Sequence, residues 1–134
     1  MQTNFKLKDE IYLAFDGLEL DLHGIYYFVG LEYSIENRTA KLIWQRGFGE
    51  YIKETLPKKV EVNFERVSFF EFSPRDPEMP FDEDECLDRA GYLLDGEWCE
   101  KEIIPDPNWK TAFEFRSGAV IAIKAGIGTA RVHP

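Results

Sequence analysis

Cysteine and histidine, the residues that most often hold a zinc ion, are scarce in this sequence. Its 134 residues include two cysteines and two histidines. Cys86 and Cys99 do not form a Cys-x-x-Cys pair, and neither histidine stands near them at the spacing of a zinc site. Residues 82–85 also lack the alternating ligand positions and the central glycine of an EF-hand loop. We therefore expect no metal site and two reduced thiols, at least one of them buried.

Long apolar runs are absent as well. No stretch approaches the roughly 18–20 consecutive apolar residues that a bilayer-spanning helix needs. The first ten residues lack the apolar core of a secretory signal, so we expect a cytoplasmic, soluble protein with no membrane partner. With 44% hydrophobic residues the chain can bury one core, and it is too short for two ordinary domains. Residues 1–134 are therefore expected to form a single domain.

Motifs of the common enzyme classes are missing too. The sequence contains no Gly-x-Ser-x-Gly, no phosphate-binding loop and no dinucleotide-binding glycine pattern. His23 is the one histidine inside the chain, and Asp21 falls on the same side of its predicted strand, so the pair could act as a general acid and base. A histidine beside a turn glycine is more often solvated or hydrogen-bonded locally. We therefore predict no catalytic residues and no cofactor.

Negative charge is what the sequence has in excess, and it is confined to one segment. The net charge of the chain is -9, and residues 76–102 account for all of it, with eleven acidic residues against only two basic ones. Such a field repels phosphate backbones and anionic membranes, and it attracts a basic protein surface. We therefore expect no nucleic-acid binding and favour a basic protein partner. The alternative is a solvated segment that only keeps the protein soluble.

The first 46 residues show the alternation of a half-buried antiparallel sheet. Apolar residues recur at alternate positions from Phe5 to Phe15, and the Asp-Gly pair at 16–17 is a favoured two-residue hairpin loop. Further turns are predicted at 24–25 and 37–38. Folding at all three turns keeps the apolar residues of successive strands, Leu20 and Leu42 among them, on one face. We predict a four-stranded meander with strands over 5–16, 18–23, 26–36 and 39–46.

The opposite face of this meander carries a row of aromatic residues. Tyr12, Tyr26 and Phe28 all point away from the predicted core. A row of exposed aromatics can form a partner surface, because such residues dominate interface hot spots. A second layer of structure could equally cover them. The sequence leaves both interpretations open.

The rest of the chain predicts more strands and one short helix. Residues 60–64 alternate as in a strand, and the Ser-Gly pair at 117–118 predicts a last hairpin in which Val120 and Ala122 lie opposite the two phenylalanines before the turn. Asp82 followed by Glu85 resembles a capping box, and apolar residues at helical spacing follow it. The expected fold class is mainly β (α+β). It comprises an antiparallel meander sheet that forms a sandwich or a partly open barrel, with one short helix around 83–94.

Four short stretches together resemble a known group of proteins. They are Leu22-His23-Gly24-Ile25, Lys41-Leu42-Ile43-Trp44, Phe64-Glu65-Arg66-Val67 and Phe113-Glu114-Phe115-Arg116-Ser117-Gly118. Their order resembles small bacterial domains of unknown function, including immunity proteins of polymorphic toxin systems. The resemblance implies a non-enzymatic acidic protein that blocks a partner by binding it. It carries over no site residues.

Three hypotheses about function follow. The first is a non-catalytic binding protein, an immunity-type inhibitor among the options, that engages a basic partner through residues 76–102. Its candidate partner-binding residues are Asp82, Glu83, Asp84, Glu85, Asp88 and Trp98. The second is a small-ligand-binding β-barrel or enzyme, with a pocket lined by polar residues such as Tyr33, Asn63 and Arg66. The third is a homo-oligomer, such as a homodimer, whose aromatic face is its own interface.

Overall fold

The computed structural model describes residues 1–99 and 108–134. It is mainly β, with three sheets that are antiparallel except for one short parallel pair between β1 and β13. The main sheet contains, in spatial order, β1 (Gln2–Thr3), β13 (Ile127–His133), β7 (Lys59–Glu65), β6 (Thr39–Arg46) and β5 (Tyr26–Ser34). The second sheet contains β10 (Glu97–Trp98), β9 (Leu87–Leu94), β11 (Lys110–Phe115), β12 (Val120–Lys124) and β8 (Phe69–Ser73). The small sheet contains β2 (Phe5–Lys8), β3 (Tyr12–Phe15) and β4 (Leu18–Asp21).

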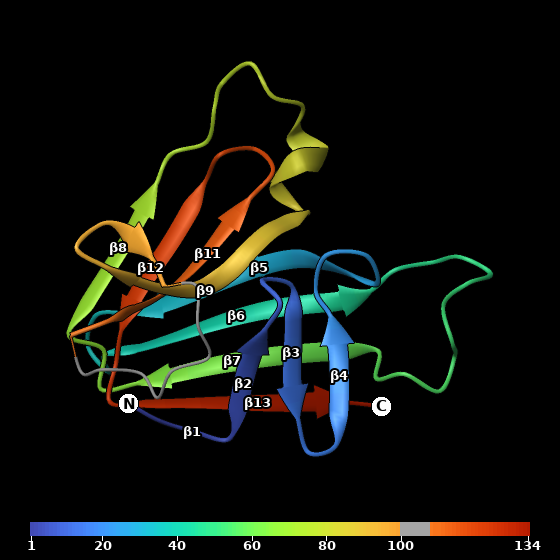
Figure 1. The fold of residues 1–134 in the computed structure, drawn as a ribbon, viewed down its shortest axis with the longest axis horizontal. Coiled ribbons are helices and arrows are strands. Elements are labelled where there is room, and N and C mark those ends of the chain that lie inside the picture. The colour runs from blue at the N-terminus through green and yellow to red at the C-terminus, as the bar shows by residue number, and fades with distance from the viewer. Residues whose placement is uncertain (100–107) are drawn as a thin grey trace.

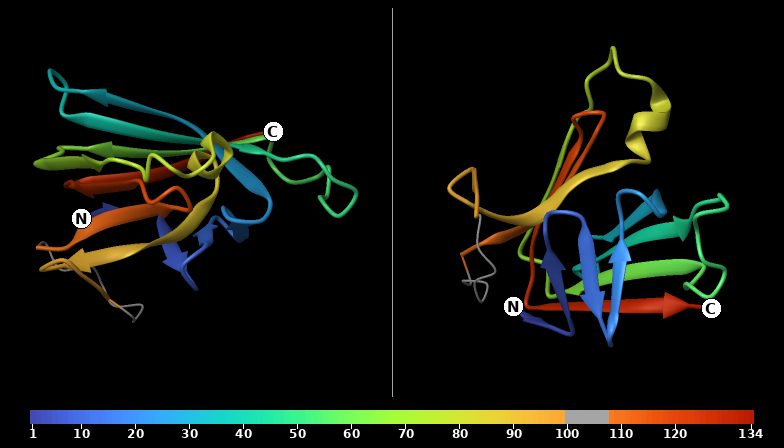
Figure 2. Two further views of the ribbon diagram at one scale, coloured as in Figure 1. Left: turned by 90° about the horizontal axis from the view of Figure 1, so that it is seen from above. Right: turned by 45° about the vertical axis from the view of Figure 1, so that its right-hand side comes forward.

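The second sheet and the small sheet pack on the same side of the main sheet (Figures 1 and 2). None of the three described sheets closes into a barrel, and the two large sheets, which share one core, are consistent with the predicted sandwich. Helical structure within the described residues is limited to the 3-10 turn η1 (Phe81–Asp84). No helix in residues 1–99 or 108–134 has the length and apolar character to cross a bilayer.

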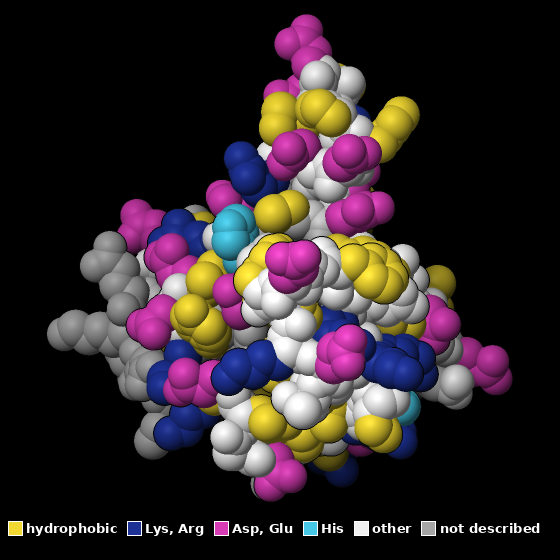
Figure 3. Space-filling model, turned by 90° about the vertical axis from the view of Figure 1, so that its right-hand side faces the viewer, with side chains coloured by type: hydrophobic (Ala, Val, Ile, Leu, Met, Phe, Trp, Pro, Cys, Tyr) yellow, Lys and Arg dark blue, Asp and Glu magenta, His cyan; other side chains and the backbone are white. Residues whose placement is uncertain are grey.

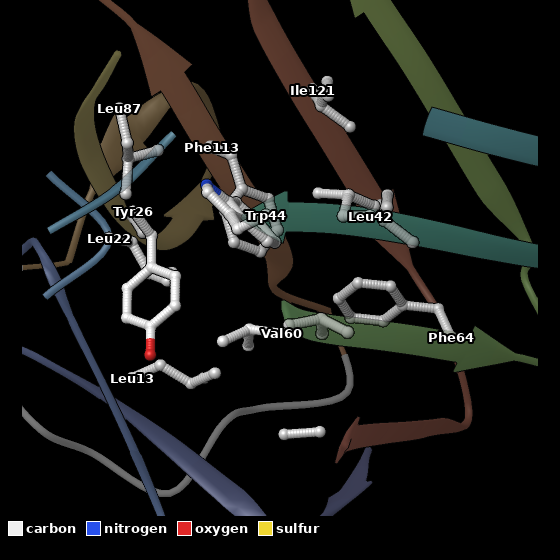
Figure 4. Close-up of a cluster of buried hydrophobic side chains, with 14 of the residues drawn as sticks. Leu13, Leu22, Tyr26, Leu42, Trp44, Val60, Phe64, Leu87, Phe113 and Ile121 are labelled. Atoms are coloured by element: carbon white, nitrogen blue, oxygen red, sulfur yellow. The ribbon is translucent and has the colours of Figure 1, made fainter. Parts of the chain in front are cut away.

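One hydrophobic cluster joins the three sheets. Trp44, Phe64 and Phe113 are its largest fully buried side chains (Figure 4). Leu20 of the small sheet and Leu42 of the main sheet belong to the same cluster, as the alternation predicted, although they lie in different sheets. Burial of these apolar side chains is the main favourable contribution to folding.

The hairpin predicted at 16–17 is confirmed. Phe15 faces Leu18 and Leu13 faces Leu20, as expected. The two loop residues, 16 and 17, have φ values of 48° and 78°. A two-residue type I′ turn requires this left-handed conformation at both positions, which an Asp-Gly pair adopts readily.

The hairpin predicted at 24–25 is wrong. The chain does turn here, but β4 and β5 belong to different sheets and do not pair. The cause is the Asp21 carboxylate, which accepts the backbone N–H groups of His23 at 2.9 Å and Gly24 at 2.7 Å. This Asx-type turn directs the chain out of the small sheet and into the main sheet.

The turn near 37–38 is present, but its loop is longer than predicted. Ser34 pairs with Thr39, so the loop contains four residues rather than two, and the register of β5 against β6 differs from the prediction by two residues. Side chains alternate with a period of two, so this difference leaves every side chain on its predicted face. Leu31 accordingly lies opposite Leu42 on the inner side.

A β-bulge at Val29 reverses the predicted faces at the start of β5. Phe28 pairs with Trp44 and Gly30 pairs with Ile43, which leaves Val29 as one extra residue. The extra residue shifts the alternation by one position. Tyr26 is therefore buried and Phe28 packs against the core, whereas Val29 is 43% exposed. Tyr26 and Phe28 are thus covered by a second layer, and the aromatic face that suggested self-association does not include them.

A second bulge explains why the helix predicted around 83–94 is absent. Residues 87–94 form strand β9, and only η1 before it is helical. Arg89 pairs with Glu114 and Leu87 with Phe115, so Asp88 is an extra residue on β9. The bulge brings Leu87 and Ala90, which are three positions apart, to the same buried face. Their spacing imitates a helical period, and for this reason the helix prediction is wrong.

The last hairpin has a three-residue loop. Phe113 pairs with Ile121, and the Phe115 N–H donates to the Ala119 carbonyl at 2.9 Å, so the register differs by one residue from that predicted for Val120 and Ala122. Gly118, with φ of 89°, ends the loop in the left-handed conformation that such loops require.

Glu61 is a buried carboxylate on the outer side of the main sheet, and it provides a test of the charge arrangement there. Burial by itself would raise the pKa of Glu61, but the ion pair with Lys59 at 2.9 Å and the charges of Lys41 and His133 outweigh it and hold the pKa below its ordinary value. A lowered folded-state pKa stabilises the protein above the ordinary glutamate pKa of about 4.3, and this contribution is lost as the pH falls through the folded-state value.

We expect Glu61→Gln to lower the free energy of unfolding by about 1–3 kcal/mol at pH 7, because the buried negative charge that Lys59 and Lys41 stabilise is lost and its charge-assisted hydrogen bond becomes a weaker one to a neutral amide. The difference from the parent protein should shrink as the pH approaches 3. Urea unfolding at both pH values measures it. Glu65→Gln, at an exposed position on the same strand, is the control and should change stability by less than about 0.5 kcal/mol. An equally large effect of Glu61→Gln at both pH values would contradict the assignment.

Candidate partner-binding surface

The structure brings four of the six predicted partner-binding residues together and places the other two in the second sheet, Asp88 at the bulge of β9 and Trp98 in β10. Asp82, Glu83 and Asp84 lie in η1, and Glu85 follows directly. Trp98 lies in β10, where it pairs with Leu93 of β9. Leu93 is six residues, or about 20 Å, from Leu87 at the start of β9. Its indole ring lies 4.4 Å from the guanidinium of Arg89. Residues 100–102, which the acidic segment also includes, lie outside the described residues.

Two of the four acids are engaged in structural contacts. Asp84 accepts hydrogen bonds from Nε of Arg75 at 2.9 and 3.1 Å. The Ser117 hydroxyl and the Arg75 guanidinium hold the pKa of Asp84 below its ordinary value. Glu83 forms an ion pair with Arg116 at 3.2 Å. These contacts fix η1 to the turn between β11 and β12.

Arg75 organises the loop that carries η1. Its Nη2 donates to the carbonyl oxygens of Met79 at 2.7 Å and Pro80 at 2.9 Å. The guanidinium carbon also lies 5.0 Å from the centre of the Phe81 ring. Three prolines in residues 74–80 end β8 and prevent a further strand from forming. One guanidinium therefore holds the irregular loop, η1 and Phe81 in a fixed arrangement.

The remaining acids are free to meet a partner. The side chains of Asp82, Glu85 and Asp88 are exposed or partly exposed, and no ion pair to them occurs within the described residues. Figure 3 shows acidic and hydrophobic side chains mixed on the upper projection of the molecule, which the loop and η1 form in Figure 1. We call Asp82, Glu83, Asp84, Glu85 and Asp88 the acidic cluster. Glu83 and Asp84 form ion pairs with arginines, whereas the other three acids form none within the described residues.

An apolar groove of about 460 Å³ lies beside the acidic cluster, between the edge strands β5 and β8. We call it the β5–β8 groove. Phe28 and Phe115 form part of its lining, with ring centres 4.7 Å apart. Phe72 of β8 is 54% exposed and Phe81 is 82% exposed, and both line the groove together with Asp84 and Glu85. Its lining is therefore aromatic, with the carboxylates of Asp84 and Glu85 and the guanidinium of Arg75, which pairs with Asp84, among the aromatic side chains.

The two sheets meet beyond the groove, where Tyr33 of β5 stacks on Phe70 of β8 with ring centres 4.2 Å apart. The groove opens toward Phe72 and η1. Tyr33 therefore does not line a ligand pocket with Asn63 and Arg66, as the small-ligand hypothesis expected. Asn63 lies in a separate pocket with Lys41 and Thr129, and Arg66 packs against Gly126.

A second, smaller pocket of about 200 Å³ lies on the other side of Glu85 and contains His23 and Cys86. The Phe28 N–H donates to the Glu85 carbonyl at 2.8 Å, between the two pockets. Cys86 Sγ lies 3.7 Å from His23 Nδ1. Sequence analysis missed this pair because its members are 63 positions apart. Neither thiol is fully buried, contrary to expectation, and both cysteines are free.

The geometry of this pair does not activate the thiol. His23 Nδ1 lies 2.5 Å from the carbonyl oxygen of Leu87. A carbonyl oxygen can only accept, so Nδ1 carries a proton and donates it there, and it cannot also take the proton of Cys86. Burial raises the pKa of the Cys86 thiol, which keeps it protonated at neutral pH. The pair therefore lacks the thiolate that a cysteine nucleophile requires.

The fold and the groove define a β-sandwich protein with an aromatic, acid-rimmed surface groove at one end. Comparison of the chain with protein-family models, with curated proteins and with solved structures finds no match. The function must therefore be argued from the chemistry of this surface.

Proposed function

We propose that this protein is a non-catalytic binding protein that engages a basic protein partner through the β5–β8 groove and the acids beside it. The observation that carries the proposal is the coincidence of two features on one surface. The unpaired acid Glu85 lines a groove together with the exposed rings of Phe72 and Phe81, and the unpaired acid Asp82, which follows Phe81 directly, lines the smaller pocket on the other side of Glu85. Exposed apolar patches with a polar rim are typical of protein interaction sites.

The two features have different roles in binding. Aromatic side chains in a groove contribute affinity, because they lose water when a partner covers them. Carboxylates at the rim steer a cationic partner and exclude an anionic one. The net charge of -9 strengthens this selection at long range. An immunity-type inhibitor would work in this way, by covering a basic surface of its target.

The test uses random 12-residue peptides displayed on phage and selected for binding to the protein. We expect the recovered peptides to be net positive and to contain apolar side chains. Asp82→Lys/Glu85→Lys should slow the association of their synthetic versions about tenfold at low ionic strength, and added salt should reduce the difference. Stopped-flow fluorescence at several salt concentrations measures both effects.

Glu65→Lys/Glu97→Lys is the matched control, because it makes the same change in net charge at exposed positions away from η1. It should slow association less than threefold. The proposal is overturned if the recovered peptides carry no net positive charge. It is also overturned if the two double variants slow association equally.

A further inference from the structure

The edge strands of the three sheets differ in how well they are protected against pairing with another chain. Exposed strand edges invite such pairing, and proteins blunt them with short strands, bulges, prolines and charges. Within the described residues, β1 and β10 have two residues each. Beyond them, the Asn4 side-chain amide hydrogen-bonds the backbone of Ala130 in β13, and the Glu10 carbonyl accepts the Ala90 N–H of β9. β5 has the bulge at Val29 and the hydrogen bond from Phe28 to Glu85. In the small sheet, β2 carries two lysines and β4 carries two acids.

β8 is the exception. It has five residues, Phe-Phe-Glu-Phe-Ser, with one acid, Glu71, and with no lysine, no proline and no break in its register against β12. It is the last strand of the second sheet, so one of its edges meets no other strand in the described chain. This free edge borders the β5–β8 groove, because Phe72 lines the groove.

The hydrogen-bond pattern shows which backbone groups of β8 are free. The Phe115 N–H donates to the Ala119 carbonyl. Residues 121 and 123 of β12, at the same alternation as 119, therefore direct their backbone N–H and C=O groups toward β11. Residues 120, 122 and 124 direct theirs toward β8, where they pair with Ser73, Glu71 and Phe69 in that order. Phe70 and Phe72 therefore direct their N–H and C=O groups to the free edge.

We propose that the basic partner adds an extended segment to the free edge of β8, as one more strand of the second sheet. This inference rests on the proposed function and specifies how the partner is held. Backbone hydrogen bonds to Phe70 and Phe72 would supply affinity, and alternate side chains would supply specificity.

The faces of β8 predict the sequence of the added strand. Residues directly opposite one another in a sheet share a face. A partner residue opposite Phe72 enters the groove beside Phe28 and Phe81, so it is apolar. A partner residue opposite Glu71 lies on the outer face, so it is lysine or arginine. The partner strand therefore alternates apolar and cationic residues.

A second copy of this chain fits the edge less well. An antiparallel β8 pair that uses both free residues of each copy has Glu71 at its centre, so that Glu71 lies directly opposite Glu71 of the other copy. Like charges in this position are destabilising. Each copy also carries a net charge of -9, so the two chains repel each other. The charges favour a cationic partner over a homodimer.

The test compares Phe72→Pro with Phe72→Ala, using the recovered peptides that depend on Asp82 and Glu85. Both variants remove the same ring, but only proline removes the N–H at the free edge, and this N–H takes no part in the ladder with β12. We expect Phe72→Pro to weaken peptide binding at least tenfold relative to Phe72→Ala.

A second measurement keeps the test independent of how well the proline variant folds. In the unaltered protein, peptide binding should slow hydrogen exchange at the amides of Phe70 and Phe72 more than at those of Phe69, Glu71 and Ser73. If the two amides stay unprotected while the peptides still depend on Asp82 and Glu85, strand addition is overturned and the proposed function stands. If no recovered peptide depends on those acids, the proposed function fails, and this inference fails with it.

Discussion

Replacing Trp44 with alanine is expected to lower the free energy of unfolding by about 3–5 kcal/mol. The Trp44 side chain is completely buried, and its ring packs against Phe28 at 5.1 Å and Phe113 at 5.6 Å between centres. These neighbours come from both large sheets, so truncation leaves a cavity at the place where the sandwich is joined. The surrounding strands are fixed by their ladders and cannot close such a cavity fully.

Urea unfolding followed by far-ultraviolet circular dichroism measures this loss. Phe48→Ala is the matched control, because it also truncates an aromatic ring but at a side chain that is 92% exposed. It should change the free energy of unfolding by less than about 0.5 kcal/mol. A loss below about 1 kcal/mol for Trp44→Ala would mean that the core is not packed around this residue.

Much of the fold could be predicted from the sequence because the signals involved are local. The hairpin at 16–17 depends only on an Asp-Gly pair between two alternating runs. The hairpin after β5 was predicted with the wrong loop length, yet Leu31 and Leu42 still lie on the predicted side because the difference was an even number of residues. An error of two residues in a predicted strand register thus still places each side chain on the correct face of the sheet.

The errors came from features that a partner strand or a distant side chain decides. The bulges at Val29 and Asp88 each add one residue, and neither residue differs visibly from its neighbours in the sequence. At 24–25 the Asp21 carboxylate, three positions away, changes a predicted hairpin into a passage between sheets. Each bulge shifts the alternation by one residue and so reverses a face, which explains the misplaced aromatic residues of β5 and the wrongly predicted helix. The turn at Asp21 explains why the predicted pairing of β4 with β5 is missing.

The candidate surface was half predictable for the same reason. The acidic run is contiguous in the sequence, so its position was evident. The groove beside it unites residues from Phe28 to Ala119, and only the packing of the two sheets brings these positions together. The division of the acids depends on Arg75 and Arg116, which lie outside the acidic run. Composition therefore located the charge, and the tertiary structure decides which charges remain free.

Deleting Tyr27 should be far more damaging than deleting Val29. Phe28 and Gly30 already pair with adjacent residues of β6, so removing Val29 deletes only the extra residue and leaves Tyr26 and Phe28 on the inner side. Removing Tyr27 instead shifts the alternation by one position, which turns either Tyr26 or Phe28 to the outer face of the main sheet. We expect the free energy of unfolding to fall by more than about 3 kcal/mol, the scale of losing one buried aromatic ring.

Deletion of Val29 is the matched control, because it shortens β5 by the same single residue without reversing a face and removes a side chain that is 43% exposed. It should cost less than about 1 kcal/mol. Thermal and urea unfolding of both variants measure the difference. Equal losses for the two deletions would mean that alternation next to the bulge does not decide which side chains of β5 are buried. If only the deletion of Tyr27 is strongly destabilising, the alternation on either side of the bulge both completes the core and places Phe28 in the lining of the groove on which the proposed partner binds.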